Sequence, residues 1–296
     1  MSARGGVAIV IATAVASAPA AARAEGGCLD REGGRAVVRE AAVFLLNPMG
    51  MEHQARLGLC EPLYASRSVA LGRNHVELGA SSYFSPVYAY VGPYAELAPA
   101  TFFSVRFELL GLGMWPIPIA GAGYYPLASA GAKFNDADVP EGKGKSAGGW
   151  VAKTTFTLLG KVDLGPKAAI VAADQLSIDH EEVGWAPYWL DVRNDLVAAR
   201  KDEVACNEAA VLFEIPIKKS FLRFGPYDAL RATPRSGYVG HQIGGMAMFE
   251  VAQPTRSIAS FAVWARLGGY THHAIRAGEP ATLLGVAFDW DLDGRL

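Results

Sequence analysis

The sequence carries little charge and almost no imbalance of sign. Charged residues make up 19% of the 296 residues, and the formal net charge is −2. A nucleic-acid-binding domain needs a basic excess to neutralise phosphates, and a disordered chain needs fewer apolar residues than the 51% present here. The composition therefore argues against a DNA or RNA partner and predicts a folded chain.

Long apolar runs are also missing beyond the amino terminus. A membrane-spanning helix needs about 18 or more uninterrupted apolar residues, and no later segment provides them. The most apolar candidate, residues 109–123, contains Pro116 and Pro118, which would break a helix. We therefore do not expect a helical membrane protein.

Catalytic and metal-binding signatures are absent as well. The sequence has no G-x-S-x-G, C-x-x-C or H-E-x-x-H pattern. His272 and His273 are adjacent, so on a strand they would point to opposite faces and would not bind one metal ion together. We predict no cofactor and no metal site, and the sequence favours a protein without catalysis.

The amino terminus has the features of an export signal. Arg4 precedes an almost entirely apolar stretch that ends in the small residues around Ala24. This pattern predicts a signal peptide over residues 1–24, cleaved near Ala24. Residues 25–68 have no clear pattern; we expect a periplasmic segment or one extra hairpin there.

Only three cysteines are present, which in an oxidising compartment suggests one disulfide and one remaining thiol. Cys28 and Cys60 flank the amino-terminal segment, so a bridge between them would anchor it. A bridge between Cys60 and Cys206 is the alternative. The sequence does not decide between these pairings.

What the chain does have is repeated alternation of apolar and polar residues. In residues 150–164 the even positions include Trp150, Phe156 and Leu158, whereas the odd positions include Lys153 and Lys161. Apolar and polar faces that alternate over about 9 to 11 residues are typical of strands that cross a membrane as a barrel. Ten segments fit this description: 70–81, 86–98, 102–115, 150–164, 167–179, 207–216, 219–230, 238–251, 257–271 and 281–292.

The connections between these segments predict the topology. Short turns near residues 99–101, 165–166, 216–219 and 253–256 fall on one side, and the long pieces 116–149 and 180–206 fall on the other. Bacterial barrels have short periplasmic turns and longer outer loops. The spacing of residues 189–202, inside the second long piece, suits a short helix. A hairpin within residues 35–61 would raise the strand count from ten to twelve.

The last segment resembles the closing-strand assembly signal of bacterial outer-membrane β-barrel proteins. Gly285 is followed by aromatic residues three and five positions on, Phe288 and Trp290. The resemblance implies a transmembrane antiparallel up-and-down β-barrel of ten to twelve strands over residues 69–296, located in the bacterial outer membrane. Its implied partners are outer-membrane lipid and the barrel assembly machinery; the oligomeric state stays open.

The polar faces indicate what fills the barrel. A secreted soluble barrel or sandwich would show the same alternation with its apolar faces forming a core, so that alternative stays open. If the apolar faces meet lipid, charges of both signs line a narrow lumen and neutralise one another. The predicted lumen-lining residues are Glu96, Arg106, Glu108, Lys153, Lys161, Asp163, Glu214, Arg266, Asp289 and Asp291.

These features predict a structural protein or a small-solute channel with a narrow charged lumen. The alternative is a membrane-embedded lipid hydrolase, because His241 lies on the apolar face near the outer end of its strand. That position resembles the catalytic histidine of outer-membrane phospholipases and lipid A deacylases. The serine that such enzymes place beside the histidine is absent, since Gln242, Ile243 and Gly244 follow it.

Overall fold

The computed structural model describes residues 35–47, 49–66, 68, 70–117, 123–131, 144–252, 258–274 and 276–291. The predicted signal peptide and Cys28 lie outside the described residues. Strands make up the described secondary structure. None of the described segments forms a helix long and apolar enough to cross a membrane.

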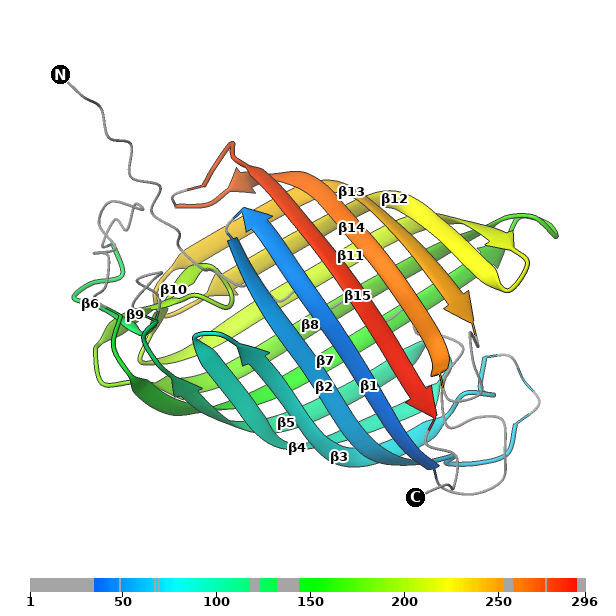
Figure 1. The fold of residues 1–296 in the computed structure, drawn as a ribbon, viewed down its shortest axis with the longest axis horizontal. Helices are drawn as coiled ribbons and strands as arrows, with labels where there is room; N and C mark the ends of the chain where they lie inside the picture. The colour runs from blue at the N-terminus through cyan, green and yellow to red at the C-terminus, as the bar shows by residue number, and fades with distance from the viewer. Residues whose placement is uncertain are drawn as a thin grey trace.

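Twelve antiparallel strands close into one barrel, in which each strand pairs with its neighbours along the chain (Figure 1). Their bounds are β1 Arg35–Asn47, β2 Met49–Glu61, β3 His75–Ser85, β4 Tyr88–Ala100, β5 Phe103–Met114, β7 Ala147–Asp163, β8 Ala169–Val183, β11 Lys201–Ile217, β12 Ser220–Thr233, β13 Tyr238–Ala252, β14 Ile258–His272 and β15 Pro280–Asp291. The fold is therefore the predicted all-β up-and-down barrel, with the higher of the two expected strand counts.

The barrel closes between its first and last strands. β15 pairs with β1 in an antiparallel ladder that includes Arg39 opposite Asp289 and Ala41 opposite Ala287. On its other side β15 pairs with β14. Closure leaves no strand edge with unpaired backbone groups, which a sheet surrounded by lipid could not tolerate.

Each of the ten predicted segments overlaps one barrel strand, with shifted ends. The largest shift is at β11, which begins at Lys201, whereas 207 was expected. The two further strands are β1 and β2, which pair as a hairpin across residues 35–61. Within the described residues the barrel therefore includes the extra hairpin that was one of the two expectations for residues 25–68.

The two longest connections leave the same end of the barrel, which we call the loop end. They join β5 to β7 and β8 to β11. The opposite end, the turn end, carries short connections such as residues 164–168 and 218–219 and also the longer connection 62–74. The division of long and short connections matches the topology predicted from the sequence.

Apolar side chains cover the outside of the barrel. Every one of the twelve strands carries at least one large apolar side chain that is exposed, and the inward positions of the same strands are buried. Soluble monomers rarely expose apolar surface on this scale. The alternative of a soluble barrel whose apolar faces form a core is therefore wrong, since these faces point outward.

A small sheet fills the loop end of the lumen. It has three strands, β6 Tyr125–Leu127, β9 Tyr188–Asp191 and β10 Leu196–Ala199, in the order β10-β9-β6. Residues 189–202 thus form β9, β10 and the start of β11, and the short helix suggested by their spacing was wrong. We call this three-stranded sheet and its connections the plug.

The plug has an apolar core of its own inside the barrel. Trp189, Leu190 and Leu196 are completely or almost completely buried, and they pack with inward side chains of the barrel wall such as Tyr88 and Leu110. β6 comes from the β5–β7 loop, and it pairs with β9 of the β8–β11 loop, which also supplies β10. The pairing that joins the two loops is therefore distant in sequence. The loop end is therefore occupied by packed protein.

Candidate functional site

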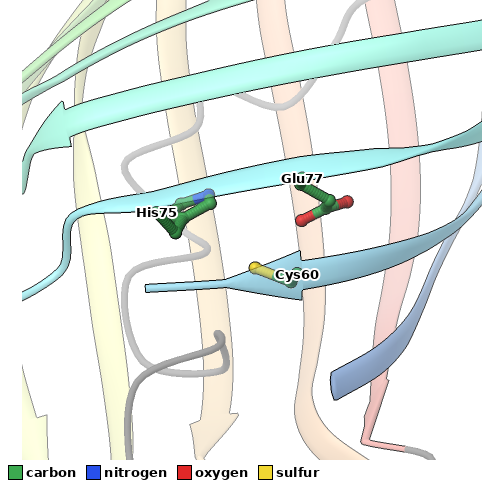
Figure 2. A group of neighbouring side chains, drawn as sticks. All are labelled: Cys60, His75 and Glu77. Atoms are coloured by element: carbon green, nitrogen blue, oxygen red, sulfur yellow. The ribbon is translucent and has the colours of Figure 1, made fainter. Parts of the chain in front are cut away.

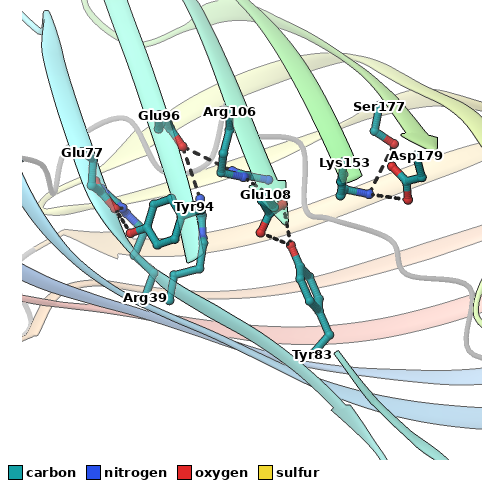
Figure 3. A network of polar contacts seen from close by, with 11 residues as sticks. Arg39, Glu77, Tyr83, Tyr94, Glu96, Arg106, Glu108, Lys153, Ser177 and Asp179 are labelled. Atoms are coloured by element: carbon teal, nitrogen blue, oxygen red, sulfur yellow. Dashed lines mark hydrogen bonds and ion pairs between the residues drawn. The ribbon is translucent and has the colours of Figure 1, made fainter. Parts of the chain in front are cut away.

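The lumen between the plug and the turn end contains a network of paired charges (Figure 3). On one side, Arg39 of β1 forms an ion pair with Glu77 of β3, and Tyr94 of β4 donates a hydrogen bond to the same carboxylate. Glu77 is completely buried. A buried carboxylate is costly without partners, and here a cation and a hydroxyl supply them.

The network continues across β4 and β5. Arg106 Nη1 lies 3.3 Å from Glu96 Oε2, and its Nε lies 3.2 Å from Glu108 Oε2. Arg56 binds the same oxygen of Glu96 at 3.3 Å. Tyr83 donates hydrogen bonds of 2.9 and 3.0 Å to the two oxygens of Glu108. Cations and anions therefore alternate along this wall.

Lys153 extends the network toward β8. Its Nζ lies 3.1 Å from Asp179 Oδ2 and 3.4 Å from Ser177 Oγ (Figure 3). Lys153 and Asp179 come from neighbouring strands that pair at these residues. The predicted lumen residue Lys153 thus has a partner directly across the ladder.

A second group of ion pairs lies on the opposite wall. Arg223 Nε is 2.6 Å from Glu214 Oε2, and the same guanidinium pairs with Glu250. Lys161 binds the other oxygen of Glu214 at 2.8 Å. These groups join β7, β11, β12 and β13 near the turn end.

A third group lies nearer the middle of the barrel. Arg266 Nη2 is 3.0 Å from Glu208 Oε2, and Arg231 Nη2 is 3.6 Å from the other oxygen of Glu208. Closer to the turn end, Asp289 accepts a 2.8 Å hydrogen bond from Ser260. Charges of both signs face the lumen on most of its circumference.

The structure places the predicted lumen residues as follows. Seven of them have buried or half-buried side chains on inward positions: Glu96, Arg106, Glu108, Lys153, Glu214, Arg266 and Asp289. Lys161 and Asp163 lie at the rim of the turn end, where the Asp163 side chain is 76% exposed. Asp291 ends β15, and its side chain lies outside the described residues.

Sequence reasoning missed several members of the network. Arg39 and Arg56 were missed because the strands that carry them were left as an optional hairpin. Glu77 lies inside the predicted segment 70–81 but was not assigned to its inward face. Arg223, Glu250 and Glu208 alternate with apolar neighbours on predicted strands. Those three could have been found by extending the inward-facing positions of each segment to all its charged residues.

The plug joins the lumen network through one arginine. Arg193, in the turn between β9 and β10, is 2% exposed, and its Nε lies 3.2 Å from Glu52 Oε2 on β2. Its guanidinium lies over the rings of Tyr83 and Tyr90, at 4.4 and 4.9 Å from their centres. Charge pairing and cation–π contacts thus hold the plug against the barrel wall.

Asp195 holds the same turn to another loop. Its Oδ2 accepts hydrogen bonds from Arg276 Nε at 3.0 Å and from Tyr270 at 3.3 Å, and it lies 3.2 Å from His273 Nε2. Burial alone would raise the pKa of Asp195. The hydrogen bond with His273 and the charge of Arg276 outweigh burial and hold that pKa below its ordinary value. Asp195 is therefore an ionised anchor at neutral pH.

Three potential metal ligands meet near the turn end. Cys60, His75 and Glu77 bring a sulfur, a ring nitrogen and a carboxylate oxygen within 4.8 Å of one another (Figure 2). Cys60 is disulfide-bonded, however, and Glu77 is already paired with Arg39. Because the sulfur is not a free thiolate, the group does not form a zinc-type site.

The state of the cysteines excludes one of the two disulfide pairings that the sequence left open. Cys206 is a free, partly buried thiol on β11. A bridge between Cys60 and Cys206 is therefore wrong.

His241 faces outward on β13, as the sequence suggested. Its Nε2 lies 2.6 Å from Asp228 Oδ2 on β12, and its Nδ1 lies 2.5 Å from Thr271 Oγ1 on β14. The sequence gave no sign of this grouping, because the three residues come from three strands. A hydroxyl stands beside the histidine even though no serine follows it in the chain.

The residues of the proposed assembly signal divide between the two faces of β15. Gly285 is buried and faces the lumen, whereas Phe288 and Trp290 are half-buried on the outer face. The rings of Phe288 and Trp290 stack at 5.9 Å with an interplanar angle of 24°. Phe288 also contacts Phe261 of β14. The two aromatic residues thus form part of the outer surface near the turn end.

The outer apolar surface, the closed ladder and the charged interior occur together in this one fold. Lipid-facing apolar residues and a polar interior are the reverse of a soluble protein. The chain is a transmembrane β-barrel.

Solved bacterial barrels have a similar fold. The β domain of the Bordetella autotransporter Brka is 11% identical, with 87% of this chain and 99% of that chain covered and a TM-score of 0.44. An outer membrane channel from Pseudomonas putida F1 is 10% identical, with 90% and 97% covered and a TM-score of 0.40. The KdgM porin in complex with disordered oligogalacturonate is 8% identical, with 86% and 99% covered and a TM-score of 0.36. No family model and no curated protein matches the sequence.

Proposed function

We propose that this protein is an outer-membrane β-barrel that forms a narrow small-solute channel, closed at rest by the plug. The loop end faces outward and the turn end faces the periplasm, after removal of the signal peptide. Lipid surrounds the apolar outer surface. The barrel assembly machinery recognises the closing strand through Gly285, Phe288 and Trp290.

The contact between Arg193 and Glu52 carries this proposal. It is a buried ion pair between the plug and the wall, and among the described residues no strand pairing joins the plug sheet to the barrel sheet. Breaking one partner of a buried ion pair costs about 3 to 5 kcal/mol, because the other charge remains buried. Loss of the Arg193 side chain should therefore weaken the attachment of the plug, which the apolar core and Asp195 also hold, while the barrel ladder stays intact.

The charges that line the lumen indicate which class of solute would pass through the channel. Selective ion channels present rings of one charge sign. Here cations and anions are paired along the wall, as in Arg106 with Glu96 and Glu108. Such a lining favours small polar solutes over one class of ion, and it leaves little free charge to attract a counter-ion.

Planar-bilayer recordings with the purified full-length protein test the proposal. We expect the wild-type barrel to conduct rarely, and Arg193→Ala to conduct for a much larger fraction of time. Arg200→Ala is the matched control, because Arg200 lies in the same loop but forms an exposed ion pair with Glu182. A folded Arg193→Ala barrel that stays as closed as the wild type would contradict a channel and leave a structural role.

One observation favours a second function, a lipid-acting enzyme of the same architecture. It is the outward grouping of Asp228, His241 and Thr271. This function does not depend on an open lumen, because the grouping lies on the outer surface. Its chemistry is developed next.

A further inference from the structure

Three polar side chains form a connected group on the lipid-facing surface near the loop end. Asp228, His241 and Thr271 occupy outward positions on the adjacent strands β12, β13 and β14. The two ring nitrogens of His241 bind the other two residues, at 2.6 Å to Asp228 Oδ2 and at 2.5 Å to Thr271 Oγ1. The histidine therefore lies between a carboxylate and a hydroxyl.

The surroundings of this group are apolar. Val239 and Ile243 flank His241 along β13, and Leu230 lies opposite it on β12. Leu267 lies four residues before Thr271 on β14. All four of these apolar side chains are exposed. Polar groups at such positions are costly unless they bind one another. The group is accessible all the same, since the His241 side chain is 31% exposed and that of Asp228 47%.

A β-bulge sets the position of Thr271. His241 pairs with His272 and Gln242 pairs with Tyr270, so the ladder passes over Thr271. A bulge leaves one residue unpaired and re-aims its side chain, and bulges occur often beside active sites. Here the bulged residue is the one whose hydroxyl meets the imidazole.

The arrangement meets the geometric requirements of nucleophilic catalysis. A hydroxyl becomes an effective nucleophile when a base within hydrogen-bond reach takes its proton and a third group orients that base. Thr271, His241 and Asp228 occupy these three positions. With Nε2–H donating to Asp228, Nδ1 of His241 is left free to accept the proton of Thr271.

We propose that Thr271, His241 and Asp228 form an acyl-transfer site that opens to the membrane and hydrolyses carboxylic esters of lipids. Thr271 Oγ1 attacks the ester carbonyl while its proton passes to His241 Nδ1. The carbon–oxygen bond to the lipid alcohol then breaks, and the alcohol leaves with that proton. Water attacks the resulting threonyl ester, returns a proton to Thr271 and releases the fatty acid.

The location on the barrel suits an ester of a membrane lipid. His241 is near the start of β13 at the loop end, and the outward positions below it, Ile243, Ala247 and Phe249, continue into the apolar band. Ester carbonyls of lipids lie between the headgroups and the acyl chains, at this same boundary. Gly245 leaves the outer surface below His241 without a side chain, with no atom within 4 Å of the place one would occupy. An acyl chain has room to lie there.

Fatty-acid release from phosphatidylcholine in mixed detergent micelles tests the site. The wild-type full chain should release fatty acid, and Thr271→Val and His241→Gln should each lower the rate at least about 100-fold, the usual effect of losing a nucleophile or general base. Thr271→Ser should retain activity, because it keeps the hydroxyl. Thr282→Val is the matched control, an outward threonine at the same end of β15, and should leave the rate unchanged.

Covalent labelling gives a readout that is independent of turnover. A long-chain fluorophosphonate should add its mass to Thr271 in the wild type and to no residue of Thr271→Val. Heat-modifiable gel mobility shows that each variant is folded. Release no faster than in protein-free micelles, or an unchanged rate in folded Thr271→Val, would overturn the proposal and leave a hydrogen-bonded surface cluster. Neither result would affect the channel, because the site does not involve the lumen.

Discussion

The indole of Trp264 occupies the space that a side chain at position 285 would need. A methyl group on Gly285 would overlap Cε2 of that ring, and the two residues pair directly across β14 and β15. Trp264 is 1% exposed and packs inside the barrel. The glycine of the closing strand therefore accommodates a lumen tryptophan, besides its place in the assembly signal.

Gly285→Ala should destabilise the folded barrel by about 1 to 3 kcal/mol, the usual cost of overpacking a filled interior. Urea unfolding in lipid vesicles, followed by gel mobility, measures this change. The double variant Gly285→Ala with Trp264→Leu should lose much less than the sum of the two single changes, because the overlap is gone. Strict additivity would contradict the steric explanation.

Trp264 belongs to a part of the barrel wall where the alternation of apolar and polar residues is weak. The lumen wall near β1, β13 and β14 holds an apolar cluster that includes Val43, Leu45, Met248 and Trp264. Period-two alternation identifies strands well where one face is apolar and the other polar. Here apolar residues occupy both faces, which is why the β1–β2 hairpin was left as an option.

Contacts between distant segments could not be predicted at all. The plug depends on strand pairing between the β5–β7 and β8–β11 loops, and Arg193 meets Glu52 across 141 positions of sequence. The contact between Thr271 and His241 could not be predicted for the same reason, because Thr271 lies on the neighbouring strand at a β-bulge. Alternation fixes which face a residue occupies, but only the register between strands fixes its neighbours.

The apolar outer surface leads us to predict that the outward residues of the strands face lipid. Phe156 is an exposed outward residue near the middle of β7, and Val162 is an exposed outward residue close to the end of the same strand. Phe156→Arg should cost about 2 to 4 kcal/mol in a bilayer, and Val162→Arg about 0 to 1 kcal/mol, because the cost of a lipid-facing arginine falls toward the interface. Unfolding in vesicles compares the two. Equal costs would mean that the apolar band does not lie in lipid.

The orientation in the membrane can be tested with single cysteines. In a Cys206→Ser background, Ser146→Cys at the loop end should react with an impermeant maleimide on intact cells. Lys167→Cys, in the turn between β7 and β8, should react only after the outer membrane is permeabilised. The reverse pattern would show that the loop end faces the periplasm.

Asp195 makes the plug sensitive to acid. Its pKa is lower in the folded state than in the unfolded chain, so ionised Asp195 stabilises the packed loops at neutral pH. That contribution is lost as the pH falls below about 4 and passes through the folded-state pKa. We expect bilayer conductance to rise in this range. The Asp195→Asn variant should already conduct at pH 7, and its conductance should not rise further in acid. If acid raised the conductance of this variant as much as that of the wild type, another group would be responsible for the acid response.

The closing strand makes the final prediction. β15 supplies one edge to β1 and the other to β14, so without it the barrel would expose two unpaired strand edges to lipid. Each unsatisfied backbone group in the hydrocarbon region costs several kcal/mol. Deleting residues 283–296 should therefore abolish insertion, whereas deleting residues 292–296, which follow β15, should leave it largely intact. Heat-modifiable mobility of the membrane fraction reports assembly in both cases. A folded, membrane-inserted product of the larger deletion would show that the ladder can close without β15, and the role given to Gly285, Phe288 and Trp290 would then have to be withdrawn.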